Sequence, residues 1–146
     1  MAVTTKLFSN FPHFLLEDKV GEDITAGDAL YIALVNDYAF DQEADDYWDD
    51  VVADEAAGAG YDADGKALAS VTCAMSTRVT TVDAADASWA SSTVTATGAV
   101  IRHFTGTDAT DLLMVYIDFD GSKASDNGTF QITFHASGIF TLTVAA

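Results

Sequence analysis

The sequence has little of several residue types, and each shortage excludes a class of protein. Cys73 is the sole cysteine among 146 residues, so neither an internal disulfide nor a thiolate zinc site can form. Because its neighbours are largely apolar, we expect Cys73 to be a small buried side chain. No apolar run approaches the ~20 residues of a membrane-spanning helix. The first twenty residues also lack the charged head and apolar stretch of a secretory signal.

Basic residues are scarce as well. Six Lys and Arg stand against 23 Asp and Glu, which gives a formal net charge of −17. Such a charge repels phosphates and anionic lipid, so we expect neither nucleic acid nor a membrane as a partner. Hydrophobic residues nevertheless make up 49% of the chain, which excludes a disordered acidic tail. The length fits one domain with a real hydrophobic core.

Motifs that carry chemistry are missing. The chain has no Gly-x-Ser-x-Gly elbow, no Gly-rich phosphate loop and no Cys–His nucleophile context. Segments 62–65 and 118–121 resemble the centre of a calcium loop but lack its first and last ligands, so we interpret both as turns. His13, His103 and His135 are scattered, although the last two could meet across neighbouring strands. We therefore expect no catalytic residues, no metal site and no cofactor, and hence no enzyme.

From residue 65 onward, apolar and polar residues alternate with the period of half-buried antiparallel strands. Short turns separate these segments, and Ser137 with Gly138 predicts a tight hairpin between the last two strands. The pattern predicts a mainly β protein, an antiparallel β-sandwich or a jelly-roll-like barrel. The expected strands span residues 28–37, 66–73, 77–84, 92–104, 111–119, 128–136 and 138–146.

The N-terminal third predicts one or two short helices. Asn10 could cap a helix that has Pro12 in its first turn. We expect residues 1–20 to form an N-terminal arm with this short helix, and residues 21–146 to form a single β-sandwich domain. A second, acidic helix is expected at 41–55, within that domain.

Segment 41–55 reads DQEADDYWDDVVADE, with eight carboxylates and no basic residue. It could be a metal site, a surface for a basic partner, or the wet face of a helix. An apolar stripe at helical spacing favours the last interpretation. The stripe consists of Ala44, Tyr47, Trp48, Val51 and Val52. On this view Trp48 anchors the core, and charge changes at Asp45 or Asp49 alter stability by less than about 0.5 kcal/mol.

A few residues are candidates for contact with a partner protein. Most aromatic residues occupy the apolar phase of their segments, so core packing explains them. Phe8 and Phe11 are exceptions, because they lie near a terminus that could reach outward. Asp45 and Asp49 are the candidates on the acidic face. The sequence therefore favours an interaction or structural role over catalysis.

Two blocks of the chain resemble small virion structural proteins of tailed bacteriophages. The blocks are ASWASSTVTATGAVIRHF (87–104) and LLMVYIDFDGSKASDNGTFQITFHASGIFTL (112–142), and the likeness extends over about residues 6–144. The matching residues of the first block are Trp89, Ser91, Ser92, Thr93, Thr95, Ala96, Val100 and Ile101. Those of the second are Tyr116, Asp118, Phe119, Gly128, Phe130, Ile132, Gly138, Ile139, Phe140, Thr141 and Leu142. The motif positions are core and turn residues, so no catalytic set comes with the resemblance. The chain departs from the pattern in its strong acidity and in having His135 near a usual aromatic position.

The resemblance implies a non-enzymatic component of the virion, assembled in the host cytoplasm. A capsid decoration (cement) protein would stabilise the shell by binding the major capsid protein or other virion proteins, as a homo-oligomer. A tail, head–tail adaptor or fibre-associated protein is the alternative within the same resemblance. A β-module that binds host-surface glycans is a further alternative, in which Trp89 and the loops at 105–110 and 120–128 would be exposed contacts.

Overall fold

The computed structural model describes residues 4–12, 24–25 and 29–145. This part of the chain is mainly β, with antiparallel pairing throughout, as the alternation predicts. Residues 10–12 are helical, with Pro12 in the first turn as expected. The strands are β1 (Thr4–Leu7), β2 (Leu30–Val35), β3 (Lys66–Ala67), β4 (Thr72–Ser76), β5 (Val79–Asp83), β6 (Ala87–Ser92), β7 (Thr95–His103), β8 (Leu113–Ala124), β9 (Gly128–Ile132) and β10 (Phe140–Thr143). The 3-10 turns are η1 (Trp48–Asp50), η2 (Val52–Asp54) and η3 (Asp108–Thr110).

A five-stranded sheet with the order β1-β8-β7-β2-β3 forms the centre of the molecule. Strand β2 carries the run LYIALV and is buried along nearly its whole length, which is typical of a strand covered on both faces. Its register aligns Ile32 with Ile101 of β7, which in turn aligns with Val115 of β8. This apolar row fixes the pairing, because a slip of one residue would turn every side chain to the other face.

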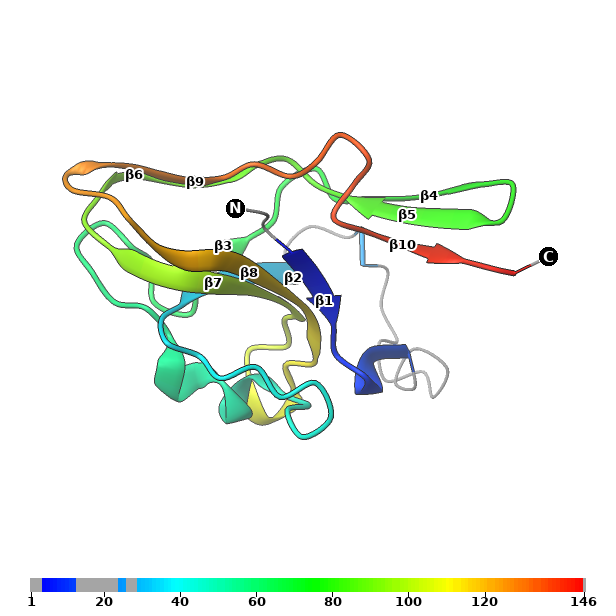
Figure 1. The fold of residues 1–146 in the computed structure, drawn as a ribbon, viewed down its shortest axis with the longest axis horizontal. Coiled ribbons are helices and arrows are strands. Elements are labelled where there is room, and N and C mark those ends of the chain that lie inside the picture. The colour runs from blue at the N-terminus through cyan, green and yellow to red at the C-terminus, as the bar shows by residue number, and fades with distance from the viewer. Residues whose placement is uncertain (1–3, 13–23, 26–28, 146) are drawn as a thin grey trace.

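Two layers cover this sheet, one on each face. Strands β6 and β9 pair with each other and lie over one face, drawn above β7 and β8 in Figure 1. The core on that side includes Trp89, Phe119 and Phe130. The loops and 3-10 turns of residues 36–56 cover the opposite face, where Trp48 and Val51 are fully buried. The arrangement is the sandwich-like fold that the sequence predicts, with an additional cover of irregular structure.

The acidic segment 41–55 is not the predicted helix. It forms a turn at 42–44 followed by η1 and η2, because its aspartates bond backbone amides nearby. Asp41 Oδ1 accepts the amides of residues 43 and 44, at 3.1 Å each, and Asp50 Oδ2 accepts those of residues 46 and 47, at 3.0 and 3.2 Å. The backbone of Trp48 donates to the carbonyl of Asp111 at 2.9 Å, which ties the segment to the sheet. Trp48 and Val51 are core residues as predicted, whereas Ala44 of the expected stripe is exposed.

The predicted hairpin at Ser137 and Gly138 is also wrong. Strand β9 ends at Ile132, and β10 pairs with β5 instead of β9. Gly138 has a φ of 95°, and a Cβ there would lie 2.8 Å from the carbonyl oxygen of Val82 in β5. Only glycine lets the chain pass this close to β5 and enter the new pairing.

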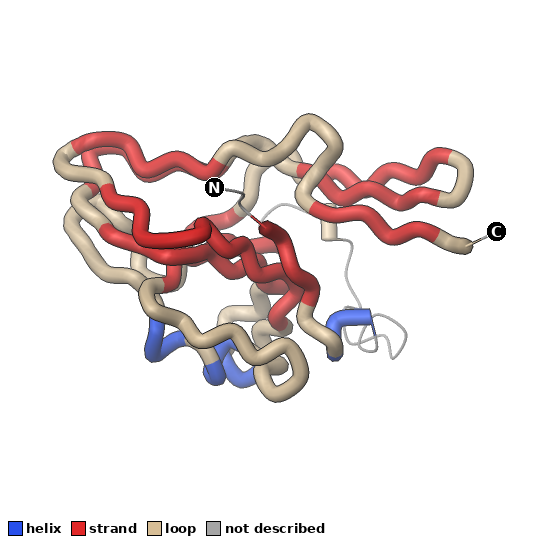
Figure 2. The backbone as a smooth tube through the Cα atoms, in the orientation of Figure 1, coloured by secondary structure: helices blue, strands red, loops and turns tan. Residues whose placement is uncertain are grey.

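Strands β10, β5 and β4 form a separate three-stranded sheet in that order. Figures 1 and 2 show it projecting away from the two main layers, with the β4–β5 hairpin at its far end and the C-terminus beside it. We call these strands, residues 72–83 and 140–144, the arm. Every residue of β4 is exposed, so none of the described residues covers this outer strand of the arm.

Candidate functional site

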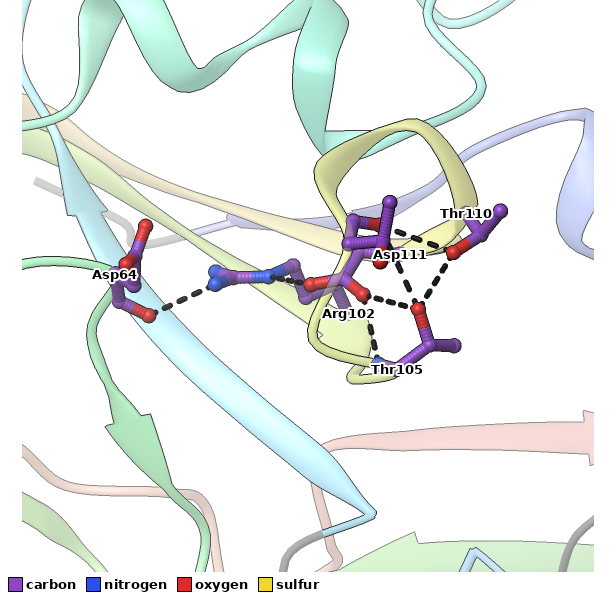
Figure 3. A network of polar contacts seen from close by, with 6 residues as sticks. Asp64, Arg102, Thr105, Thr110 and Asp111 are labelled. Atoms are coloured by element: carbon purple, nitrogen blue, oxygen red, sulfur yellow. Dashed lines mark hydrogen bonds and ion pairs between the residues drawn. The ribbon is translucent and has the colours of Figure 1, made fainter.

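A buried ion pair is the most polar feature of the interior. Arg102 of β7 donates from Nε to Asp111 Oδ2 at 3.0 Å, and both side chains are excluded from solvent. Asp111 Oδ1 accepts two further bonds, from the backbone amide of Thr105 at 2.7 Å and from its hydroxyl at 2.8 Å. Figure 3 shows how Arg102 reaches on the other side to the carbonyl of Asp64, at 2.8 Å. The network therefore joins two loops, residues 36–65 and 104–112, to the central sheet.

The guanidinium of Arg102 also stacks on Trp48. Its central carbon lies 4.1 Å from the centroid of the indole ring, within the range of a cation–π contact. Arg102 Nη1 and Trp48 Nε1 are buried and have no hydrogen-bond partner among the described residues. Neither the groove beside β9 nor the smaller cavity at residues 53–57 and 93–95 is lined by residues of this cluster. The arrangement stabilises the fold by holding the acidic segment against the sheet.

The sequence alone does not reveal this network. Alternation placed Arg102 in a strand, but a charged residue there reads as an ordinary solvent-facing position. The nearest signal was the Arg-His pair inside an otherwise apolar strand, with an aspartate just before the next strand. Because the pairing depends on the η3 loop folding back, no fixed spacing could identify Asp111 as the partner.

The four candidate contact residues lie in different environments. Phe8 and Phe11 are buried in the core, so the expectation that they reach outward is wrong. Phe11 packs edge-on against Phe140, with ring centroids 5.7 Å apart, and this contact anchors the base of the arm. Asp49 is exposed, whereas Asp45 is half-buried and accepts the hydroxyl proton of Tyr38 at 2.5 Å.

Two tyrosines, Tyr38 and Tyr61, are largely shielded from solvent and bond to carboxylates of segment 41–55. Burial, reinforced by the bond to Asp45, raises the pKa of Tyr38 well above its ordinary value of 10.0. Burial and the neighbouring Glu55 raise the pKa of Tyr61 in the same way, and its hydroxyl donates to Glu55 at 2.8 Å. Burial also raises the pKa of Glu55. These phenols stay protonated donors that hold carboxylates in place.

The structure also shows where the histidines, Trp89 and the loop at 105–110 lie. His103 is buried, and His135 is exposed in the loop after β9, whereas His13 lies outside the described residues. Within residues 4–12, 24–25 and 29–145, no group of three or more His, Cys, Asp or Glu side chains could hold a metal ion. Trp89 is buried, so it is not the exposed glycan contact that the further alternative requires. The loop at 105–110 is exposed as expected.

The arm carries the exposed apolar side chains. Among the described residues, the exposed large hydrophobic side chains are Met75 (76% exposed), Leu142 (36%) and Val144 (70%), and all three lie in the arm. Cys73 is exposed in β4, so the expectation that it is buried is wrong. Alternation in a strand does not show whether a layer covers its apolar face, and here no described layer does. This clustering makes the arm the candidate interaction surface.

A groove lies between the two main layers where β8 and β9 diverge. Its volume is about 810 Å³. Its lining includes the apolar residues Phe119, Phe130 and Ile132, together with Lys123 and His135. Among the described residues, its lining contains no group of three or more His, Cys, Asp or Glu side chains that could hold a metal ion.

Comparison with protein-family models, curated proteins and solved structures gives no match for this chain. No helix in the described part of the chain is both long and apolar enough to cross a membrane.

Proposed function

We propose that this chain is a non-enzymatic structural protein of a tailed-bacteriophage virion, and most specifically a capsid decoration protein. The observation that carries a binding role is the projecting arm, which presents Met75, Leu142 and Val144 to solvent. Exposed apolar side chains gathered on one element are typical of a surface that another protein covers. The resemblance of residues 87–104 and 112–142 to virion proteins supplies the biological setting.

The geometry suits a protein that works by contact. Many of the motif residues that carry the resemblance, such as Trp89, Ile101 and Phe130, are buried core positions. They maintain a sandwich that carries the arm, while the arm and the loops provide surface. Many copies on one shell would make individually weak contacts effective through multivalency. The net charge of −17 would keep decorated particles soluble and apart from one another.

The number of copies per particle tests this proposal. Purified particles of the phage that encodes the chain would be digested and measured by mass spectrometry against isotope-labelled peptides of this protein and of the major capsid protein. Hundreds of copies support head decoration. Six or twelve copies would contradict it and favour the tail or adaptor alternative. Absence from purified particles would contradict a virion role altogether.

Release of the protein provides a second, functional readout. Particles stripped of the protein should lose their genome at a lower temperature than intact ones, because extra interface area resists separation of shell subunits. Adding back the purified protein should restore the original temperature. A stripped particle that is equally heat-stable would show that the protein does not act as cement.

A further inference from the structure

One face of the arm is an outward extension of the hydrophobic core. The strand register aligns Met75 of β4 with Thr80 of β5, and Thr80 with Leu142 of β10. Residues aligned across antiparallel strands point to the same face of the sheet. Two residues closer to the body, the next row is Cys73, Val82 and Phe140. Val144 lies two residues beyond Leu142 and so belongs to this face as well.

Burial along this face falls from the base of the arm to its tip. Val82 at the base is 3% exposed, and Phe140 is half-buried against Phe11. Farther out, Met75 and Val144 are mostly exposed. The opposite face is mainly polar, with Thr141 and Thr143 on β10. The apolar arm face is our name for the face described first. It is formed by Cys73, Met75, Thr80, Val82, Phe140, Leu142 and Val144.

The arm has few acidic residues in a very acidic chain. Its residues, 72–83 and 140–144, include one acidic residue, Asp83, and one basic residue, Arg78. Two copies that each carry a charge of −17 repel one another wherever their carboxylates approach closely. Because the arm projects from the body, two arms can meet while the acidic bodies stay farther apart. Two arms can therefore meet with little repulsion between carboxylates.

We propose that the apolar arm face binds the same face of a second copy of this chain, in a two-fold symmetric dimer. The exposed large hydrophobic side chains of the described residues all lie on this face, so its best complement on another copy is the face itself. A two-fold axis places one patch against its equal and closes the assembly at two copies. The inference rests on the proposed role in protein–protein contact, and it names one partner in that role.

The size of the patch sets the expected strength. A stable interface buries about 800 Å² on each partner. Among the described residues, the apolar arm face carries only three exposed large hydrophobic side chains, Met75, Leu142 and Val144. The dimer should therefore be weak in dilute solution. It would become significant where many copies are held close together, as on a particle surface.

Sedimentation equilibrium of the purified full chain tests the proposal. We expect a monomer–dimer equilibrium that strengthens when salt is raised from about 0.1 M to about 1 M, since the screening length falls from about 10 Å to about 3 Å. A salt dependence of this sign is the opposite of that for binding through opposite charges. A chain that stays monomeric at every concentration and salt level would overturn the proposal. Masses that grow beyond two copies would also overturn it, because they would indicate arm insertion elsewhere, such as the groove beside β9.

Neighbouring residues on the same strands provide matched variants. Val144→Glu and Met75→Glu place a carboxylate on the apolar arm face and should weaken the dimer at least tenfold. Thr143→Glu and Ala74→Glu add the same charge to the opposite face and should change the dissociation constant much less. Circular dichroism and thermal unfolding would establish that all four variants are folded. Equal weakening by both pairs would overturn the proposal, since it would show an effect of net charge alone.

Cys73 gives an independent readout on the same face. Its alkylation by a maleimide should slow as the wild-type protein is concentrated into the dimer, and should stay fast in Val144→Glu. A rate independent of concentration across a measured dimerisation would place the interface elsewhere and overturn the proposal. The copy-number measurement on particles is separate. A monomeric protein present in hundreds of copies would sink this inference and leave the decoration role standing, whereas a dimer absent from particles would do the reverse.

Discussion

Asp111→Asn is the most informative single substitution in this protein. Asparagine keeps the shape of the side chain and one acceptor oxygen, but it removes the charge that balances Arg102. The three bonds to the carboxylate, at 2.7, 2.8 and 3.0 Å, cannot all be kept by an amide. Arg102 is fully buried, so its charge would remain uncompensated away from water. Removing one partner of a buried pair costs about 3–5 kcal/mol.

That loss is large for a domain of this size. Total stabilities are about 5–15 kcal/mol, so Asp111→Asn should remove a substantial part and lower the melting temperature by roughly 6–20 °C. Urea unfolding followed by circular dichroism measures the free energy of unfolding directly. Asp108→Asn in the adjacent η3 turn is the matched control, because that side chain is exposed and should leave the midpoint unchanged.

A double-mutant cycle separates the ion pair from simple loss of packing. Arg102→Met retains the length of the side chain and removes its charge. In the pair Arg102→Met/Asp111→Asn no buried charge is left, so the double variant should be more stable than the sum of the two single losses predicts. A cost below about 1 kcal/mol for Asp111→Asn, or strictly additive losses in the cycle, would refute the role given to the buried pair.

Three further predictions concern the hydrogen bonds between tyrosines and carboxylates, the pH dependence of stability, and the exposure of the arm. Tyr38→Phe and Asp45→Asn should each destabilise the fold by about 1 kcal/mol in urea unfolding, because each breaks a part-buried hydrogen bond. For Asp45 this replaces the sequence-based expectation of less than about 0.5 kcal/mol. Asp49→Asn should have no effect, and equal effects at Asp45 and Asp49 would count against this bond. The raised pKa values of Tyr38 and Tyr61 mean that, above pH 10, the folded state keeps phenol protons that the unfolded state releases. The contribution of each tyrosine to the stability of the fold is therefore complete below pH 10. It is lost as pH rises above 10, by up to about 1.4 kcal/mol per pH unit for each tyrosine. Tyr61→Phe should make the alkaline loss shallower in unfolding curves measured from pH 9 upward, and an unchanged slope would contradict the assignment. Cys73 should react with Ellman's reagent in dilute native protein nearly as fast as in denaturant, and strong protection there would disprove its exposure.

The alternation of apolar and polar residues along the sequence was sufficient to predict the fold class. The alternation of Phe130 and Ile132 with polar neighbours predicts a half-buried strand, and β9 is such a strand. The run at 30–35 predicts a buried strand, and β2 lies at the centre of the sheet. Trp48 and Val51 were predicted to be buried, and they are, although the segment is not helical. An apolar side chain is buried when its position in the segment turns it toward the core. Both an α-helix and the observed 3-10 turns turn Trp48 and Val51 toward the core.

Long-range contacts decided the rest. Segment 41–55 does not form a helix, because its aspartate side chains accept hydrogen bonds from nearby backbone amides. In addition, the carbonyl of Asp111 accepts a hydrogen bond from the backbone amide of Trp48 across the fold. Strand β10 pairs with β5 because Gly138 permits close passage beside Val82. Neither partner is near in sequence, so no local period could indicate the pairing.

The sequence by itself determined the alternating strands, the core aromatic residues and the strong negative charge, because each follows from the composition and spacing of a short stretch. Only the tertiary structure decided that Arg102 and Asp111 form a buried pair and that the apolar face of β4, β5 and β10 extends outward with no described layer over it. The same alternation describes a covered strand and an uncovered one. What lies against a face is set by distant parts of the chain, or by another molecule.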